Sequence, residues 1–500
     1  MRNTAADYPY PRFDTRLVSM HCERRAATEV KLRHDPRTAV LIALILTMAL
    51  VAMDTTILAT AVPQVVGDLG GFDQVGWVFS VYLLAQTVTI PIYGKLTDLY
   101  GRKPVLVFGV AVFLIGSALS AGAWNMLSLI LFRAVQGIGA GAIGSTVQTV
   151  AGDLYTVAER GRIQGYLASV WGISAVIAPA LGGVFAQYLS WRWIFLVNIP
   201  IGVFALYLIV RDLHDDVVRR SHRVDYLGSA LVLVAAGMLI LGLLQGGTTW
   251  AWNSTASFTV FAIAVAAAVA LIFVERRAAE PVLPSWLWTK RRTAASMAAT
   301  ATAGTIVIGL SVYLPNWGQT VLGLSPIAAG FVLAVMSITW PLASGISARI
   351  YLRIGFRNTA LLGAITAVAA GAGFALLGPE SPVWQPAACA ALMGVGMGWM
   401  FSPLLVGLQN TVGWDQRGTI TGGLMFARFL GQSLGAAGFG AVANTVLRQQ
   451  HDQPAAVAMH SATHAVFVGL LVAGLITVVL LMFVPRRFPS HTATTHEPAP

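Results

Sequence analysis

One carboxylate stands apart from the other acidic side chains of this 500-residue chain. Of the 21 Asp and Glu residues, only Asp54 falls deep inside a long apolar run, in a span expected near 38–66. A charge at bilayer depth is costly, so such a group normally faces a cavity and has a task. Because hydrocarbon disfavours the ionised form of a carboxyl group, we expect Asp54 to gain and lose a proton in the working range. Asp54 is therefore the best candidate for an ion-coupling site.

A cation and an amide lie in another apolar run, FRAVQGIGAGAIGS. Arg133 lies about eight residues from the outer end of its span and Asp54 about twelve from the same side, so their depths differ by only about 6 Å. Arg133 can therefore pair with Asp54 directly or through water, although a long arginine side chain can instead extend to the outer surface. Gln136, one turn further along, could hold the arginine or touch a ligand.

Composition places these residues in a polytopic helical membrane protein. The chain is 56% hydrophobic and 11% charged, with a mean hydropathy of +0.71, whereas soluble domains are about 25% charged. About fourteen apolar runs are long enough to cross a bilayer as helices. All but four of the 32 Lys and Arg residues fall in segments that face the same side, which predicts that both termini are cytoplasmic. The net charge of +11 thus reports topology and contact with anionic lipid, not a nucleic-acid partner.

Two long polar loops divide the chain, because they bracket a single pair of spans. Removing that pair leaves six spans on each side, a layout found in transporters built from two related bundles. We therefore predict a disordered cytoplasmic tail at 1–37, an N-terminal six-helix bundle at 38–212, an inserted two-helix hairpin with its flanking loops at 213–293, a C-terminal six-helix bundle at 294–484 and a second cytoplasmic tail at 485–500.

The segment GKLTDLYGRKP should form the cytoplasmic loop between spans two and three. Gly94 and Gly101 permit a tight turn and close helix approach. Asp98 can accept charge-assisted hydrogen bonds from a neighbouring helix N-terminus or an arginine, and Arg102 and Lys103 would anchor the loop at lipid head groups. The alternative is an ordinary basic loop that only follows the positive-inside rule.

The same segment has a weak echo in the second half of the chain. In LRIGFRN, after the tenth span, Gly355 and Arg357 match Gly101 and Lys103, but no acid matches Asp98. The echo supports two related halves.

Arg428 is a second cation inside a span, in GLMFARFLGQSLGAAGFG. It could hold an anionic ligand or form a second gate, or it could pair with helix carbonyls or with Gln432. Tyr313, Trp317 and Trp399 are candidates for lining a cavity, although most aromatic side chains of such a chain pack or lie in the interface belt. No phosphate loop and no set of Cys and His at metal-ligand spacing is present, so the sequence predicts neither an enzyme nor a metal site.

Several of these segments, in the correct order, resemble the major facilitator superfamily, and within it the fourteen-span drug:proton antiporter-2 family. G-x-L-x-D-x-x-G-R-K is the signature loop of the superfamily, and R-x-x-Q-G-x-G resembles its proton-transfer motif. The stretches around Asp54, Ser190–Gly202 and Tyr313–Gly330 are similar to the family's first span and to two of its connections.

The fifth span, GYLASVWGISAVIAPALGGVF, resembles the antiporter motif G-x-x-x-G-P-x-x-G-G of the superfamily's exporters. Pro179, Gly182 and Gly183 match, whereas Ser174 and Ala178 replace the two earlier glycines. Simple close packing of small residues is the alternative interpretation.

The resemblance implies an all-α integral membrane protein with the major facilitator fold, that is, two six-helix bundles plus an inserted hairpin and fourteen transmembrane helices in all. It implies a proton-driven exporter of drugs or other hydrophobic or cationic small molecules, located in the cell membrane and active in multidrug efflux and antibiotic resistance. By the same resemblance the exporter works by alternating access: unprotonated Asp54 accepts the cargo, a proton from outside displaces it, and the charges of the signature loop latch the outward-facing state.

The expected partners follow from this mechanism. They are the small-molecule substrate, protons and membrane lipids; the proton gradient replaces a cofactor, and we expect a monomer. One alternative is an exporter of a single lipid or metabolite. The other is a membrane enzyme or sensor that transports nothing.

Overall fold

The computed structural model describes residues 36–71, 74–215, 225–247, 249–450, 452–486 and 488. The predicted tails at 1–37 and 485–500 therefore lie almost wholly outside the described residues. Within these residues the chain is helical, and the one bridge between extended residues, Gly246 with Trp250, forms no strand.

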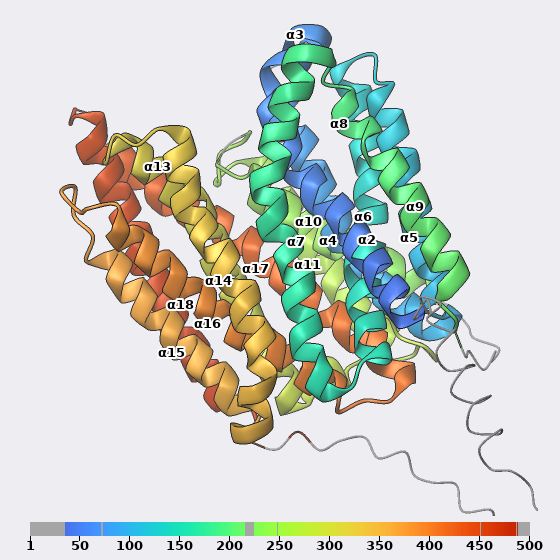
Figure 1. The fold of residues 1–500 in the computed structure, drawn as a ribbon. Coiled ribbons are helices and arrows are strands. Elements are labelled where there is room, and N and C mark those ends of the chain that lie inside the picture. The colour runs from blue at the N-terminus through green and yellow to red at the C-terminus, as the bar shows by residue number, and fades with distance from the viewer. Residues whose placement is uncertain are drawn as a thin grey trace, which may run out of the picture.

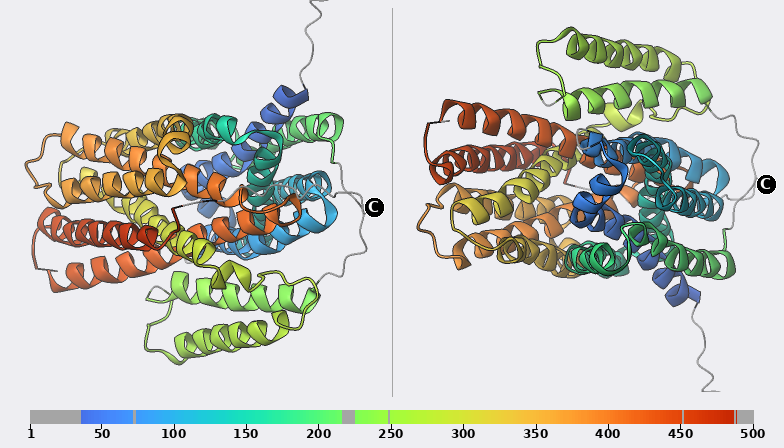
Figure 2. Two further views of the ribbon diagram at one scale, coloured as in Figure 1. Left: turned by 90° about the horizontal axis from the view of Figure 1, so that it is seen from below. Right: turned by 90° about the horizontal axis from the view of Figure 1, so that it is seen from above.

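The helices fall into a first set of six, a pair and a second set of six (Figures 1 and 2). The first set is α2 (Pro36–Ile57), α4 (Val75–Tyr100), α5 (Arg102–Ala121), α6 (Met126–Leu154), α7 (Val157–Val184) and α9 (Asn198–Asp212). The pair is α10 (Tyr226–Gln245) and α11 (Thr255–Glu275). The second set is α13 (Arg291–Thr320), α14 (Pro326–Ile354), α15 (Phe356–Ala375), α16 (Trp384–Gln409), α17 (Trp414–Gln449) and α18 (Ala455–Met482). Short turns α3 (Val62–Leu69), α8 (Trp193–Leu196) and α12 (Trp286–Thr289) connect them.

Thirteen helices of the described chain are long and apolar enough to cross a membrane. The remaining long helix, α17, has 36 residues but is less apolar, because it carries Arg428 at its centre and charged residues at both ends. The fold confirms the predicted all-helical membrane architecture.

The first span is shorter than expected. Instead of continuing to residue 66, α2 ends at Ile57, and a 3-10 turn (Leu58–Ala61) leads into α3. Pro63 explains the break, because proline has no N–H to donate and its ring clashes with the carbonyl four residues earlier. Asp54 consequently lies in the last turn of α2.

Each six-helix bundle has its own apolar core. One core cluster joins α2, α4, α5, α6, α7 and α9, and another joins α13 to α18. Figure 2 shows the α10–α11 hairpin beside the two bundles. Of its two helices, α10 contacts both α4 and α17, so it packs across the boundary between the bundles.

The bundles meet near one end of the helices. We call this the basic end, defined by the junctions of α4 with α5, α6 with α7, α14 with α15 and α16 with α17. Glycines permit the contact, because a side chain would not fit. A Cβ added to Gly94 would lie 3.0 Å from the Cα of Gly422, and a Cβ added to Gly165 would lie 3.0 Å from the Cα of Gly345. From this end the bundles diverge towards α3 in Figure 1.

Candidate functional site

Asp54 is the centre of a closed hydrogen-bond network inside the N-terminal bundle. Arg133 Nη1 donates to Asp54 Oδ2 at 2.5 Å and to Gln136 Oε1 at 2.7 Å. Gln136 Nε2 in turn donates to Asp54 Oδ1 at 2.8 Å. The exposed fractions are 0% for Asp54, 1% for Arg133 and 0% for Gln136. The structure thus brings together all three residues that the sequence singled out, and Arg133 does not extend to the surface.

A second layer of polar groups surrounds this triad. Gln136 Nε2 also lies 2.8 Å from Ser117 Oγ on α5, to which Asn198 Nδ2 on α9 donates at 2.9 Å. The guanidinium of Arg133 stacks on the ring of Tyr82 on α4, with its Cζ atom 4.1 Å from the ring centroid. Sequence reasoning missed these three residues. Only Asn198 carried a signal, since it lies in the SWRWIFLVNIPIG stretch that resembles a family connection.

Helix geometry explains why the network closes. Arg133 and Gln136 are three residues apart and so lie on one face of α6. Glycine lets the neighbouring helices approach that face, because a Cβ on Gly116 of α5 would lie 2.6 Å from the backbone nitrogen of Gln136. The carboxylate therefore receives donors that rigid, closely packed helices hold in place.

The arrangement changes one expectation about Asp54. Both carboxylate oxygens are bonded by groups of the chain itself and the side chain has no exposed surface. In this conformation Asp54 therefore does not contact a cargo molecule. Protonation of the carboxyl would remove the charge that balances Arg133, and removing one partner of a buried ion pair leaves the other charge uncompensated. The network therefore depends on the charge of Asp54.

A second charged cluster joins the two bundles at the basic end. Asp98 lies within α4, not in a loop, and it accepts from the backbone N–H groups of Gly418 and Thr419, each at 2.7 Å, and from Thr419 Oγ1 at 2.7 Å. These donors belong to the first turns of α17. The prediction that Asp98 accepts from a neighbouring helix N-terminus is confirmed, and its contact with Arg102 Nη1 at 3.3 Å confirms the predicted arginine.

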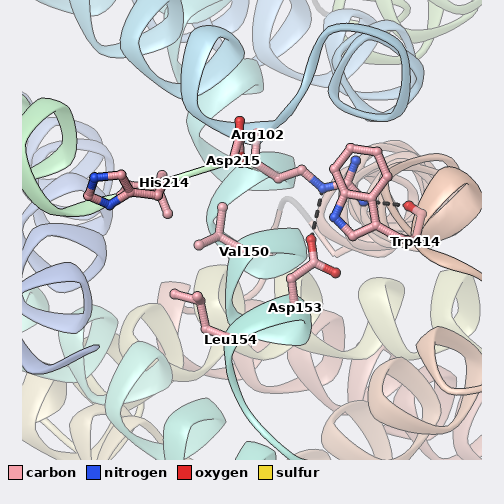
Figure 3. A pocket seen from close by; sticks show the side chains of 8 residues that line it. Arg102, Val150, Asp153, Leu154, His214, Asp215 and Trp414 are labelled. Carbon is pink, nitrogen blue, oxygen red and sulfur yellow. Dashed lines mark hydrogen bonds and ion pairs between the residues drawn. The ribbon is translucent and has the colours of Figure 1, made fainter. Parts of the chain in front are cut away.

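Arg102 is part of the same cluster (Figure 3). Its side chain donates to Asp153 Oδ2 at 2.8 Å and to the carbonyl of Trp414 at 2.5 Å, and it stacks on the Trp414 ring at 3.6 Å. Asp153 also binds Arg417. The expectation that Arg102 lies at lipid head groups is wrong, because it is 1% exposed and ties α5 to α6 and α17.

Lys103 lies at the edge of this cluster. Its Nζ donates to the Val210 carbonyl at 2.8 Å, and its backbone N–H donates to Asp215 Oδ2 at 2.6 Å. Arg102, Asp153, Trp414 and Asp215 line a pocket of about 260 Å³. Burial raises the pKa of the Asp215 carboxyl, and the hydrogen bond from Lys103 opposes that shift.

The exporter-like segment lies in α7, which packs against α2. Gly182 is required by that contact, since a Cβ there would lie 2.7 Å from the Ile57 carbonyl, three residues after Asp54. A Cβ on Gly183 would meet nothing within 4 Å. Pro179 lies inside α7, where Ser174 and Ala178 are both buried. The segment thus brings α7 next to the last turn of α2.

The aromatic residues expected to line a cavity are not gathered around Arg428. Trp317 is 1% exposed and belongs to the core, where its Nε1 donates to His460 Nδ1 at 3.2 Å. Tyr313 packs in a small cluster between α17 and α18, and the buried indole N–H of Trp399 has no hydrogen-bond partner among the residues that the structure describes. Arg428 instead lies over the rings of Trp340 and Phe401. Among the described residues no group of three His, Cys, Asp or Glu could hold a metal ion.

Comparisons with known proteins agree with this architecture. The family model of the Major Facilitator Superfamily matches residues 44–224 and 215–436. Multidrug resistance protein 3 of Bacillus subtilis is 37% identical over 412 residues, which are 81% of this chain and 80% of that protein. The multidrug transporter protein MdtP of the same organism is 34% identical over 416 residues (82% and 76%), and the efflux pump FUS6 of Gibberella moniliformis is 32% identical over 415 residues (80% and 72%).

A solved structure shares the fold. The crystal structure of the human organic anion transporter MFSD10 (TETRAN) superposes with a TM-score of 0.60 at 16% identity, covering 89% of this chain and 98% of that chain. At this identity the likeness concerns the fold alone.

Proposed function

The chain belongs to the major facilitator superfamily and is therefore a membrane transporter and not an enzyme, and from this premise we propose that it is a proton-coupled exporter of hydrophobic or cationic small molecules. Relatives named as multidrug transporters and efflux pumps support export as the direction. The observation that carries proton coupling is the buried triad, in which an acid inside the bilayer is held by one arginine and one glutamine.

We place the basic end of the molecule in the cytoplasm of a cell-membrane protein with both termini inside. The asymmetry of Lys and Arg supports this orientation. In that orientation the described conformation is closed towards the cytoplasm, where Asp98 and Arg102 tie the N-terminal bundle to α17. It corresponds to the outward-facing state of a transport cycle.

The proposed cycle couples the triad to this closure. Cargo enters from the cytoplasm when the basic end is open, and closure of that end exposes the cargo to the outside. A proton that reaches Asp54 neutralises it and frees Arg133 and Gln136, which lowers the affinity for cargo. Only such a difference in affinity between two states can drive the conformational change. One titratable acid in the core predicts about one proton per turnover.

The test replaces the Asp54 carboxyl group with a neutral amide of nearly the same shape. Purified full-length protein is reconstituted in proteoliposomes with an imposed pH gradient, and accumulation of a fluorescent lipophilic dye is followed. We expect Asp54→Asn to abolish dye accumulation driven by the pH gradient, because asparagine cannot exchange a proton, while insertion into the membrane remains intact. Asp415→Asn is the matched control, since Asp415 is an exposed carboxylate at the start of α17.

One result would contradict the assignment of Asp54 as the proton carrier. If the Asp54→Asn protein still builds a dye gradient that an uncoupler collapses, another group carries the proton.

A pump for one metabolite is the second candidate. A relative 30% identical over 418 residues is the MFS-type transporter of the acurin A biosynthesis cluster of Aspergillus aculeatus. Competition between the dye and structurally unrelated compounds in the same vesicles separates the two, since a dedicated pump would show no competition.

A further inference from the structure

Arg428 is a cation without a partner. In the part of the chain that the structure describes, its side chain makes no hydrogen bond or ion pair, and its Nε atom is buried without an acceptor. Arg133, which lies inside the N-terminal bundle, has Asp54 and Gln136 as acceptors. The two arginines thus differ in their acceptors: a carboxylate balances Arg133, and no carboxylate of the described residues balances Arg428.

Two stacked rings lie beneath the unbalanced charge. The Cζ atom of Arg428 is 4.8 Å from the ring centroid of Phe401 and 5.2 Å from that of Trp340. The two rings are nearly parallel, at 10° with centroids 5.3 Å apart. Cation–π contacts of this kind attract the guanidinium, but they leave its hydrogen-bond donors unused.

The cluster lies on three helices of the C-terminal bundle, close to the contact between the two bundles. Arg428 is six residues beyond Gly422, which packs against Gly94 of α4, so it lies about 9 Å further along α17. Trp340 directly precedes Pro341, whose carbonyl faces Gly165 of α7. All three side chains of the cluster are partly exposed. Each side chain therefore keeps some surface that a bound molecule can contact.

We propose that Arg428, Trp340 and Phe401 form a binding site for the acidic group of an otherwise hydrophobic cargo. A guanidinium binds a carboxylate or phosphate through two parallel hydrogen bonds, which supplies the acceptors that the chain lacks here. The parallel rings offer an apolar surface to the ring or hydrocarbon next to that group. The inference rests on the proposed export function and narrows its cargo to the hydrophobic compounds that also carry an acidic group and, among the cationic compounds, to zwitterions.

The test compares two ligands that differ in one charge. Full-length protein in lipid nanodiscs is titrated into a rhodamine dye with a free carboxylate and into the methyl ester of the same dye, and binding is read by fluorescence anisotropy. The wild-type protein should bind the acid at least tenfold more tightly than the ester. Arg428→Gln should abolish this preference by weakening binding of the acid at least tenfold, with the ester unchanged.

Two further variants make the result specific. Arg428→Lys keeps the charge but loses the forked donor geometry, so it should retain part of the preference for the acid. Arg448→Gln removes an exposed cation from the far end of the same helix and should behave like the wild type. Ester binding and the melting temperature of each variant show whether the protein is folded.

Three outcomes would overturn the site. They are a wild-type protein that binds neither dye, one that binds acid and ester equally, and an Arg428→Gln protein that keeps the preference for the acid. The measurement uses no pH gradient, so it is independent of proton coupling. A wild-type protein that keeps the acid preference but accumulates no dye when a pH gradient is imposed would refute the exchange mechanism alone. A wild-type protein that accumulates dye but shows no acid preference would refute this site alone.

Discussion

Among single residues, Arg133 has the most demanding position, because it holds a full charge in a closely packed bundle. Its neighbours are Asp54, Gln136 and the ring of Tyr82, and it has almost no exposed surface. The charge is tolerated because the groups that balance it come from the same bundle: Asp54 from α2, the Tyr82 ring from α4 and Gln136 from α6 itself.

We therefore expect Arg133→Gln to destabilise the protein by about 3–5 kcal/mol, since it leaves the Asp54 carboxylate buried without its cation. Adding Asp54→Asn to that variant should recover part of the loss, because the orphaned charge is removed as well. Thermal unfolding of the three proteins in one detergent, at neutral pH, measures the difference. Equal melting temperatures for the single and the double variant would show that the pair is not the source of stability.

The sequence predicts the triad better than its surroundings. Counting residues from span ends places Asp54 and Arg133 at similar depth, and charges inside apolar runs are rare enough to be noticed. Ser117 and Tyr82 have no such signal, because serine and tyrosine are common in membrane helices and only packing shows which of them face the acid. Likewise, Arg428 is visible in the sequence, but its lack of a partner is a property of the fold.

At the scale of helices, the contact between α4 and α17 controls how closely the basic end can close. A Cβ on Gly94 would lie 2.7 Å from the Gly418 carbonyl and 3.0 Å from Gly422 Cα. Backbone atoms cannot move aside as the end of a flexible side chain can, so the helices themselves must separate.

Gly94→Ala should consequently destabilise the closed conformation of the basic end by about 1–3 kcal/mol and so favour the open one. Nitroxide labels at Arg162 and Arg353, exposed near the basic ends of α7 and α14, report the separation by pulsed electron resonance in a protein lacking Cys22 and Cys389. We expect a longer distance to gain population in the variant. Gly144→Ala makes the same change in α6 where a Cβ meets nothing, and its distance distribution should match that of the parent protein.

The signature segment, Gly94–Pro104, shows that a local sequence pattern does not predict where a helix ends. We predicted a loop over Gly94–Pro104, but α4 continues to Tyr100 and α5 begins at Arg102, so the connection is Gly101 alone. Sequence places the glycines and the acid correctly, whereas the length of a helix depends on the partner it packs against. The predicted echo in the second half has a structural counterpart: Gly101 has φ 96° and ψ 165°, and Gly355 has φ 88° and ψ 159°.

For the whole molecule, the proposed cycle makes the balance between the closed and the open basic end depend on contacts that cross between the bundles. Asp98 accepts three hydrogen bonds from α17 in the closed state, and it would lose them when the basic end opens. Hydrogen bonds to a charged group contribute about 1.5–3 kcal/mol each, and each 1.4 kcal/mol changes a population ratio tenfold.

Asp98→Asn should therefore shift the population towards the open basic end by roughly tenfold or more. The same label pair reads the shift, and Asp415→Asn, an exposed acid one residue after Trp414, should leave the distribution unchanged. A distribution for Asp98→Asn that equals that of the parent would mean that helix packing alone keeps the end closed.

Composition and loop lengths suffice to predict six helices, two helices and six helices, because span length and the bias of basic residues are read from the chain directly. They do not predict which end is closed. That property depends on pairs such as Arg102 with Trp414 and Asp153 with Arg417, whose members are far apart in the sequence and individually unremarkable.

Two equivalent contacts, one in each half of the chain, bear on how the protein can move. Lys103 binds the carbonyl of Val210 near the end of α9, and Arg357 binds the carbonyls of Leu481 and Met482 at the end of α18. In each half, the side chain two residues after the sharp glycine turn is thus clamped to the final helix of that half. These contacts couple the turn at the basic end of each half to the last helix of that half, so we expect each half to move as a unit and the rearrangement to occur where the two halves meet.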